Sequence, residues 1–178
     1  GPCKQNVASE DGFKALEIIR ANSKKWDIDS NNVGVIGFSA GGHLASTIST
    51  KGKLGFNKPD FAILVYPVIT MNMDKQTWTF RSLFGDNPDE SIIQNYSNDL
   101  NVNKETPSTI LIHSNNDKGT PPENSISYYS ALRKYNIPAS LHIWEDGGHG
   151  YGLAKGRGTI ESWTKIVKEW MTLRGVIN

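Results

Sequence analysis

Four short apolar runs, each bounded by turn-forming residues, constrain the fold of this chain more than any other feature. Apolar runs without polar alternation are typical of strands that are buried on both faces of a parallel sheet. The runs occupy residues 32–38, 61–66, 109–113 and 139–144, and Pro67 ends the second one. The sequence therefore predicts four buried strands.

Segments that favour helices fill the intervals around these runs. They span residues 9–25, 43–50, 123–135 and 161–173. Strands that alternate with helices form βαβ units with right-handed crossovers, and the helices then cover a parallel sheet. The sequence therefore predicts an α/β fold, with a mostly parallel sheet flanked by helices.

Two regions give more local expectations. Ser9 is the expected N-cap of the first predicted helix, ahead of acidic residues in the first turn. The apolar face of that helix is predicted to consist of Phe13, Leu16 and Ile19, extended by Ala15 and Ile18. Residues 68–105 are polar and irregular, and one short helix is expected within them, at 90–95.

Length and charge limit the domain count and the classes of partner. The 178 residues are enough for one domain, residues 1–178, and too few for two ordinary ones. Because 19 basic residues nearly balance 18 acidic ones, there is no electrostatic reason to expect nucleic acid or an anionic membrane as a partner. No run approaches the roughly 18 apolar residues of a membrane helix. We expect a single domain with no nucleic-acid or membrane partner.

The sequence also lacks the usual patterns of metal and cofactor sites. Cys3 is the only cysteine, which excludes an intrachain disulfide and a thiolate metal cluster. The histidines and carboxylates do not have metal-ligand spacing. Neither a phosphate-binding loop nor a dinucleotide fingerprint is present. We therefore expect neither a metal nor a cofactor.

A Gly-Phe-Ser-Ala-Gly sequence at residues 37–41 follows the first predicted strand and precedes a helix. This strand–turn–helix setting is the one that a nucleophile elbow requires. We expect side chains at Gly37 and Gly41 to clash with the neighbouring elements. Ser39 would lie at a helix N-terminus, where the backbone N–H of Ala40 can stabilise an oxyanion. The alternative is a glycine-rich turn with an N-capping serine, and the buried strand favours the nucleophile.

A serine nucleophile needs a base, and the chain has four histidines. His149 stands on a glycine-rich loop after the last predicted strand, from which it can reach over the edge of the sheet. His43 shares a helix with Ser39 and is expected to pack or cap around the elbow. His113 and His142 lie in predicted strands, where a core position is the default. We therefore predict that His149 is the base.

The base in turn needs an acid that orients its ring. Asp117 follows the third predicted strand, so it emerges at the same edge of the sheet as Ser39 and His149. The order serine, aspartate, histidine is that of α/β-hydrolases. Glu145 and Asp146 are rival acids, but they share the loop of His149 and would need a local hairpin to reach its ring. Asp117 could also be only a loop residue or a helix cap.

Four segments together resemble the acetyl xylan esterase-like proteins, which form a bacterial carbohydrate-esterase branch of the α/β-hydrolase superfamily. They span residues 37–45, 59–70, 117–129 and 138–152. The resemblance implies an α/β-hydrolase fold, a triad of Ser39, Asp117 and His149, and an oxyanion donor at the Ala40 N–H. It also implies hydrolysis of acyl esters of small molecules or polysaccharides, acetyl esters of carbohydrates above all, and a secreted or periplasmic location.

One departure from the family pattern shapes these expectations. Members of this branch carry a His-Gly-Gly-type loop and several strands ahead of the region seen here, and nothing before Ser9 matches them. We expect the second oxyanion donor to come from a segment upstream of Gly1 or from another chain. Two alternatives stay open: a serine peptidase like the prolyl oligopeptidases, and a non-catalytic carbohydrate-binding or interaction module that kept the elbow.

Overall fold

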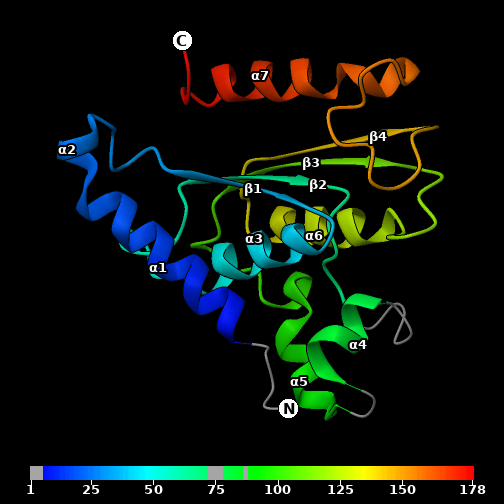
Figure 1. The fold of residues 1–178 in the computed structure, drawn as a ribbon, viewed down its shortest axis with the longest axis horizontal. Helices are drawn as coiled ribbons and strands as arrows, with labels where there is room; N and C mark the ends of the chain where they lie inside the picture. The colour runs from blue at the N-terminus through cyan, green and yellow to red at the C-terminus, as the bar shows by residue number, and fades with distance from the viewer. Residues whose placement is uncertain (1–5, 72–77, 86–87) are drawn as a thin grey trace.

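Four parallel strands form the sheet of this protein, whose computed structural model describes residues 6–71, 78–85 and 88–178 (Figure 1). The strands are β1 (Gly34–Phe38), β2 (Phe61–Val65), β3 (Ser108–Ser114) and β4 (Ala139–Trp144). Their order in the sheet is β1-β2-β3-β4, and all three pairings are parallel. The four predicted strands and the parallel sheet are thus confirmed.

Helices cover both faces of the sheet, as predicted (Figure 1). One face carries α7 (Trp163–Leu173), which a 3₁₀ helix (Gly158–Ser162) precedes. The other face carries α3 (Ala40–Lys51) and α6 (Glu123–Lys134), and α1 (Val7–Ala21) packs against α3. This three-layer arrangement is that of an α/β fold.

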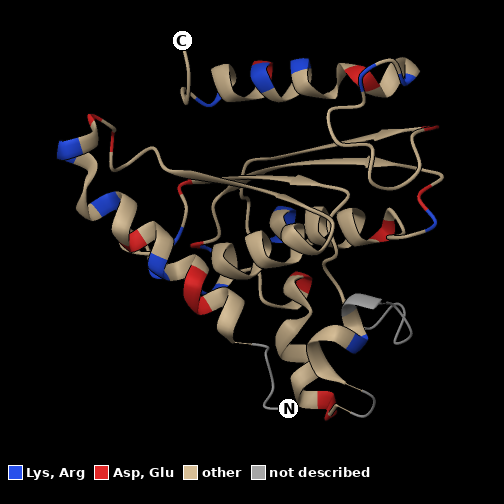
Figure 2. Cartoon of the chain, in the orientation of Figure 1, with Lys and Arg blue, Asp and Glu red and all other residues tan. Residues whose placement is uncertain are grey.

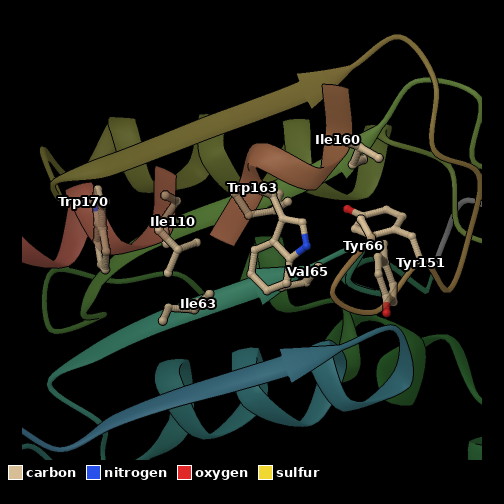
Figure 3. Packing of buried hydrophobic residues seen from close by; sticks show 11 residues of the cluster. Ile63, Val65, Tyr66, Ile110, Tyr151, Ile160, Trp163 and Trp170 are labelled. Carbon is tan, nitrogen blue, oxygen red and sulfur yellow. The ribbon is translucent and has the colours of Figure 1, made fainter. Parts of the chain in front are cut away.

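The two cores lie between the sheet and these helix layers. On the α7 side, the rings of Trp163 and Trp170 pack over strand residues such as Ile63 and Ile110 (Figure 3). On the other side, residues of β2 and β3 pack against α6, and Leu132 of that helix is fully buried. None of the four described strands contains a Lys, Arg, Asp or Glu residue, and the charged residues of the described ranges lie on helices and connecting segments (Figure 2). Burial of both faces accounts for the unbroken apolar runs of the central strands β2 and β3.

Between β2 and β3 the chain forms a small helical excursion. It contains α4 (Trp78–Phe84), α5 (Glu90–Tyr96) and a 3₁₀ helix (Asn98–Leu100). α5 confirms the short helix predicted at 90–95, whereas α4 was not predicted. A separate cluster of buried side chains holds the excursion together, formed by Met71, Phe80, Phe84, Ile93 and Tyr96.

The first helix differs from the prediction at its start and on its apolar face. α1 begins at Val7, so Ser9 lies within the helix, and its Oγ donates to the Asn6 carbonyl at 2.9 Å. Ser9 is therefore not the N-cap. Ile18 and Ala15 are exposed, contrary to expectation. At 100° per residue Ile18 points about 200° away from the buried Leu16, so the face toward α3 cannot include both.

The helix also ends earlier than residue 25. α1 stops at Ala21, and a separate turn, α2 (Ser23–Trp26), follows and ends at Asp27 in a left-handed conformation with φ of 53°. The predicted continuous helix is thus two helical segments.

Full burial holds for the central strands, β2 and β3, but not for β1 or β4. Ile36 is 50% exposed, although it lies in an apolar run. β1 is an edge strand of the described sheet, and α7 packs over β2 and β3 instead. β4 is the other edge strand, none of its residues is buried, and Ile143 is 39% exposed. The expectation of four buried strands is therefore wrong for β1 and β4.

Candidate active site

The carboxyl ends of β1, β3 and β4 bring the three predicted catalytic residues together. Ser39 follows β1 directly, Asp117 lies three residues after β3, and His149 lies five residues after β4. In a parallel sheet these ends meet at one edge, which is where ligands bind in open α/β folds. The structure therefore places all three side chains at the expected edge.

Ser39 occupies a strained turn between β1 and α3. Its φ of 52° and ψ of −121° are unusual for a residue with a side chain. Two hydrogen bonds from the turn fix this geometry: the Ser39 N–H donates to the Val65 carbonyl, and the Val68 N–H donates to the Ser39 carbonyl, both at 3.1 Å. The last residue of β2 and the backbone just after it thus support the turn.

Close packing requires two glycines of the elbow: Gly37, as predicted, and Gly42, which was not predicted. A Cβ at Gly37 would lie 2.3 Å from the Gly41 carbonyl oxygen, and a Cβ at Gly42 would lie 2.5 Å from Pro67 Cβ. A Cβ at Gly41 would have no described atom within 4 Å. The predicted clash at Gly41 is therefore wrong. The close approach on the helix side is one residue later, where α3 passes Pro67.

The three side chains form one continuous hydrogen-bonded chain. Ser39 Oγ lies 2.8 Å from His149 Nε2, and His149 Nδ1 lies 2.8 Å from Asp117 Oδ2. An ionised carboxylate only accepts hydrogen bonds, so Nδ1 carries the ring proton and Nε2 is free to accept from the serine hydroxyl. This arrangement matches a nucleophile, a base and an orienting acid.

The Asp117 carboxylate is buried and surrounded by donors. Its Oδ1 accepts from the backbone N–H groups of Gly119 and Thr120, each at 2.8 Å. Burial acts to raise the pKa of Asp117, but hydrogen bonds from His113, the Thr120 N–H and His149 outweigh it and hold the pKa below its usual value. Asp117 is therefore ionised at neutral pH and can stabilise a positively charged His149.

His113 is a core histidine, as expected, but it also contacts the acid. The ring is fully buried, and its Nδ1 lies 2.8 Å from Ser125 Oγ. Nε2 lies 2.9 Å from the Thr120 carbonyl and 3.4 Å from Asp117 Oδ2. Since both are acceptors, Nε2 carries the proton. A spacing of four residues indicates a contact only within a helix, and His113 and Asp117 lie in β3 and in the loop after it, so the sequence did not indicate this contact.

The other two histidines lie away from the serine. His43 Nε2 donates to the Tyr96 carbonyl at 2.8 Å, and its ring stacks on Tyr96. Burial lowers the pKa of His43 to about 4, so the ring is neutral at pH 7. This agrees with the expected packing role. His142 is half-buried on β4, and burial lowers its pKa as well.

Neither rival acid contacts His149. The Asp146 carboxylate accepts from the side-chain amide of Asn116 and from the Gly147 N–H, the latter at 2.8 Å. Glu145 is exposed. Of the acids considered from sequence, Asp117 is the one whose carboxylate contacts the ring.

A tyrosine that the sequence did not single out forms a wall beside His149. Tyr66 follows β2 with a φ of 38°, and its ring lies edge-on to the imidazole at 5.0 Å between centroids. The Gly152 N–H donates to its hydroxyl at 3.3 Å, and Tyr151 packs against it at 4.5 Å (Figure 3). The positive φ so close to the serine marks a position held by its surroundings.

The N-terminus of α3 offers a donor for an oxyanion. Ala40 is the first residue of α3, so its N–H has no acceptor within the helix. The residue is also exposed. The helix dipole also favours negative charge at this point. A mostly apolar cavity of about 300 Å³ adjoins Ala40 and Gly41, and Leu44, Leu83 and Tyr96 form part of its wall.

Two other classes of site have no support in the described part of the chain. Residues 6–71, 78–85 and 88–178 contain no group of three or more His, Cys, Asp or Glu side chains placed to hold a metal ion. None of the described helices has both the length and the apolar character that crossing a membrane requires.

Comparison with known sequences identifies relatives that act on xylan. The chain is 40% identical over 149 residues to an acetylxylan esterase of Xylanibacter ruminicola, an alignment that covers 81% of this chain and 30% of that protein. It is 31% identical over 155 residues to endo-1,4-beta-xylanase B of Butyrivibrio fibrisolvens, covering 82% of this chain and 24% of that protein. The chain thus spans less than a third of these two relatives.

Solved structures and a family model agree with these relatives. An acetyl ester-xyloside bifunctional hydrolase from Caldicellulosiruptor lactoaceticus superposes with a TM-score of 0.90 at 36% identity, covering 96% of this chain and 66% of that one. A sugar hydrolase from Lactococcus lactis gives a TM-score of 0.81 at 27% identity, covering 95% and 70%. The model described as the prolyl oligopeptidase family, Peptidase_S9, matches residues 4–173. This chain therefore belongs to the prolyl oligopeptidase family of α/β-hydrolases.

Proposed function

We propose that this chain carries the catalytic residues of a serine esterase that removes acyl groups, acetyl groups above all, from carbohydrates. The observation that carries the proposal is the hydrogen-bonded chain from Ser39 through His149 to the buried Asp117, with 2.8 Å at each step. The names of the relatives, an acetylxylan esterase and an acetyl ester-xyloside hydrolase, support the substrate class.

In the proposed reaction, Ser39 Oγ attacks the ester carbonyl while His149 Nε2 takes the hydroxyl proton. The imidazolium formed is stabilised by the ionised Asp117, which also keeps the ring oriented. The Ala40 N–H donates to the oxyanion of the tetrahedral intermediate. His149 then returns the proton to the leaving alcohol, which separates and leaves an acyl-serine.

The second half of the reaction repeats these roles with water. His149 Nε2 takes a proton from a water molecule that attacks the acyl-serine, and the acid departs as Ser39 regains its proton. A second oxyanion donor is expected from the family pattern, but its His-Gly-Gly loop has no counterpart in this sequence. One missing donor typically costs about 10²–10³-fold in turnover. Activity assays therefore call for the full-length protein.

Replacement of Ser39 by alanine in the full-length protein tests the proposal. We expect hydrolysis of p-nitrophenyl acetate to fall by about 10⁴-fold or more, because the nucleophile is removed. Ser91→Ala is the matched control, since Ser91 is an exposed serine on α5. If the Ser39→Ala variant keeps its activity, the proposed nucleophile is wrong.

The family assignment favours a second candidate, a peptidase that cleaves after proline, because the matching family model is that of the prolyl oligopeptidases. The same triad would serve either reaction. Parallel assays with acetylated xylan and with an aminoacyl-proline anilide distinguish the two activities. A fluorophosphonate probe addresses the non-catalytic alternative, since only an activated Ser39 reacts, and full-length protein that stays unlabelled would favour that alternative.

A further inference from the structure

Two loops carry the proposed acid and base, and one asparagine joins them. We name residues 115–120 the acid loop and residues 145–150 the base loop. Asn116 Oδ1 accepts from the backbone N–H groups of Gly148 and Gly147, at 2.8 Å and 3.1 Å. Its Nδ2 donates to Asp146 Oδ1. A single side chain of the acid loop thus makes three hydrogen bonds to the base loop, and none of them takes part in the proposed proton transfers.

Neighbouring contacts fix the same two loops. The buried Ser114 Oγ donates to the Gly148 carbonyl at 2.5 Å, and the Asn115 N–H donates to the Trp144 carbonyl at 2.7 Å. A Cβ at Gly147 would lie 3.0 Å from Ser114 Cβ and 2.6 Å from Ile160 Cδ1. The base loop therefore lies directly against the end of β3 and has little room to shift toward it.

The composition of the base loop explains why this loop needs hydrogen bonds from the acid loop to keep its conformation. Residues 147, 148 and 150 are glycines, and Gly148 and Gly150 have positive φ values of 64° and 70°. Glycine loses more conformational entropy on folding than any other residue, so this segment does not hold its shape by itself. His149 nevertheless has to stay within hydrogen-bond distance of both Ser39 and Asp117. A misplacement of about 1 Å can cost about 10²-fold in rate.

We propose that Asn116 is a positioning residue. Its hydrogen bonds between the acid loop and the base loop keep His149 within hydrogen-bond distance of both Asp117 and Ser39. Asp146, considered above as a rival acid, is then the anchor for the Asn116 amide. The inference rests on the proposed function for its catalytic readout, and on the loop contacts alone for its structural readout.

Four variants of the full-length protein test this role. Asn116→Ala removes all three hydrogen bonds, and we expect kcat to fall by about 10–100-fold with KM changed by less than about twofold. Asn116→Asp keeps an acceptor for the two glycine N–H groups but places a second carboxylate against Asp146, and a similar loss is expected. Asp146→Asn alone should lower kcat only slightly, because the amide oxygen of the new side chain still accepts from Asn116.

The decisive variant is the exchange pair Asn116→Asp with Asp146→Asn. It swaps donor and acceptor across the loops at unchanged net charge. The Gly147 N–H donates to both Asp146 Oδ1 and Asn116 Oδ1 in the unmodified protein, and in the pair it keeps only the carboxylate at position 116 as its acceptor. We therefore expect the pair to recover most of the kcat lost in Asn116→Asp alone. Asn115→Ala is the matched control: Asn115 is an exposed neighbour whose side chain has no hydrogen bond to any residue within the described ranges. Its kcat should be unchanged.

Hydrogen exchange of the peptide that covers residues 145–150 supplies a readout independent of catalysis. We expect faster exchange at Gly148, whose N–H donates to Asn116 Oδ1, in Asn116→Ala and slower exchange again in the exchange pair. Gly147 should change less in Asn116→Ala, because its N–H keeps Asp146 Oδ1 as an acceptor. An exchange pair no better than Asn116→Asp alone, in kcat and in exchange rate, overturns the role of Asn116. If Ser39→Ala instead retains activity, the proposed function fails, while the exchange rates still decide whether Asn116 fastens the loops.

Discussion

Replacement of Asp117 by asparagine changes the shape of the side chain little, and the surrounding hydrogen bonds determine how the amide must orient. Asp117 Oδ1 accepts from two backbone N–H groups, at 2.8 Å each. An NH₂ group cannot accept, so the amide oxygen must take this position and the NH₂ group must face His149 Nδ1. Two donors would then oppose each other. His149 relieves this conflict by moving its proton to Nε2. The NH₂ group also faces the Nε2–H of His113, which keeps the Thr120 carbonyl as its acceptor.

That tautomer cannot accept the proton of Ser39, and this sets the size of the effect. We expect kcat to fall by about 10⁴-fold, the scale on which a triad acid acts through the tautomer of its histidine. At 1.36 kcal/mol for each tenfold change, this corresponds to about 5.4 kcal/mol of activation free energy. The assay is steady-state hydrolysis of p-nitrophenyl acetate by the full-length protein.

Asp146→Asn is the matched control for this prediction, since Asp146 lies on the base loop but faces Asn116 rather than the ring. We expect less than about a threefold change, because a neutral amide oxygen keeps the hydrogen bond. A loss below tenfold for Asp117→Asn, or equal losses for the two variants, would refute the argument that Asp117 selects the tautomer of His149.

Two further predictions concern stability. Gly42→Ala should lower the free energy of unfolding by about 1–3 kcal/mol, because the added Cβ meets Pro67. Gly41→Ala should be neutral or stabilising by up to about 1 kcal/mol, as expected for alanine in a helix. Urea denaturation that ranks the two variants in the opposite order contradicts the packing described. The pKa of His43 is about 4 in the folded protein, below the ordinary value of about 6.5, so between these values only the unfolded chain binds the proton. Acidification through that window should therefore remove up to about 3 kcal/mol of stability. His43→Gln keeps a donor for the Tyr96 carbonyl and should flatten this part of the pH profile, and an unchanged slope in urea midpoints measured from pH 7 to pH 4.5 would show that His43 is not its source.

The sheet was predictable because each strand is a short apolar run between turn-forming residues, and burial on both faces explains these runs for the central strands β2 and β3. The same reasoning misled at Ile36, because the apolar pattern does not say which strand lies at an edge. Similarly, the pattern of α1 identified its buried face through Leu16 but not its first residue, because the helix begins two residues before the expected cap.

In the site, too, some residues could be predicted from the sequence and others could not. Ser39, Asp117 and His149 could be selected from sequence because each follows a strand, in an order that parallel topology converts into proximity. Asn116 could not, because its hydrogen bonds depend on the path of a loop 30 residues further along the chain. The contact between Gly42 and Pro67 likewise depends on how closely α3 passes the end of β2. Distances between loops are set by tertiary packing, which local sequence patterns do not encode.

The in-order sheet has a consequence for how the protein matures. Because β1, β2, β3 and β4 lie side by side in the order of synthesis, each new unit can pair with the one completed before it. Ser39 is in place once β1 and β2 have paired, since the carbonyl of Val65 and the N–H of Val68 hold its turn. Its partner His149 arrives only with the segment after β4. Under the proposed function, a nascent chain that ends before β4 would contain the residues that hold the Ser39 turn but would lack the proposed base, so we expect hydrolysis only after the segment that follows β4 has been added.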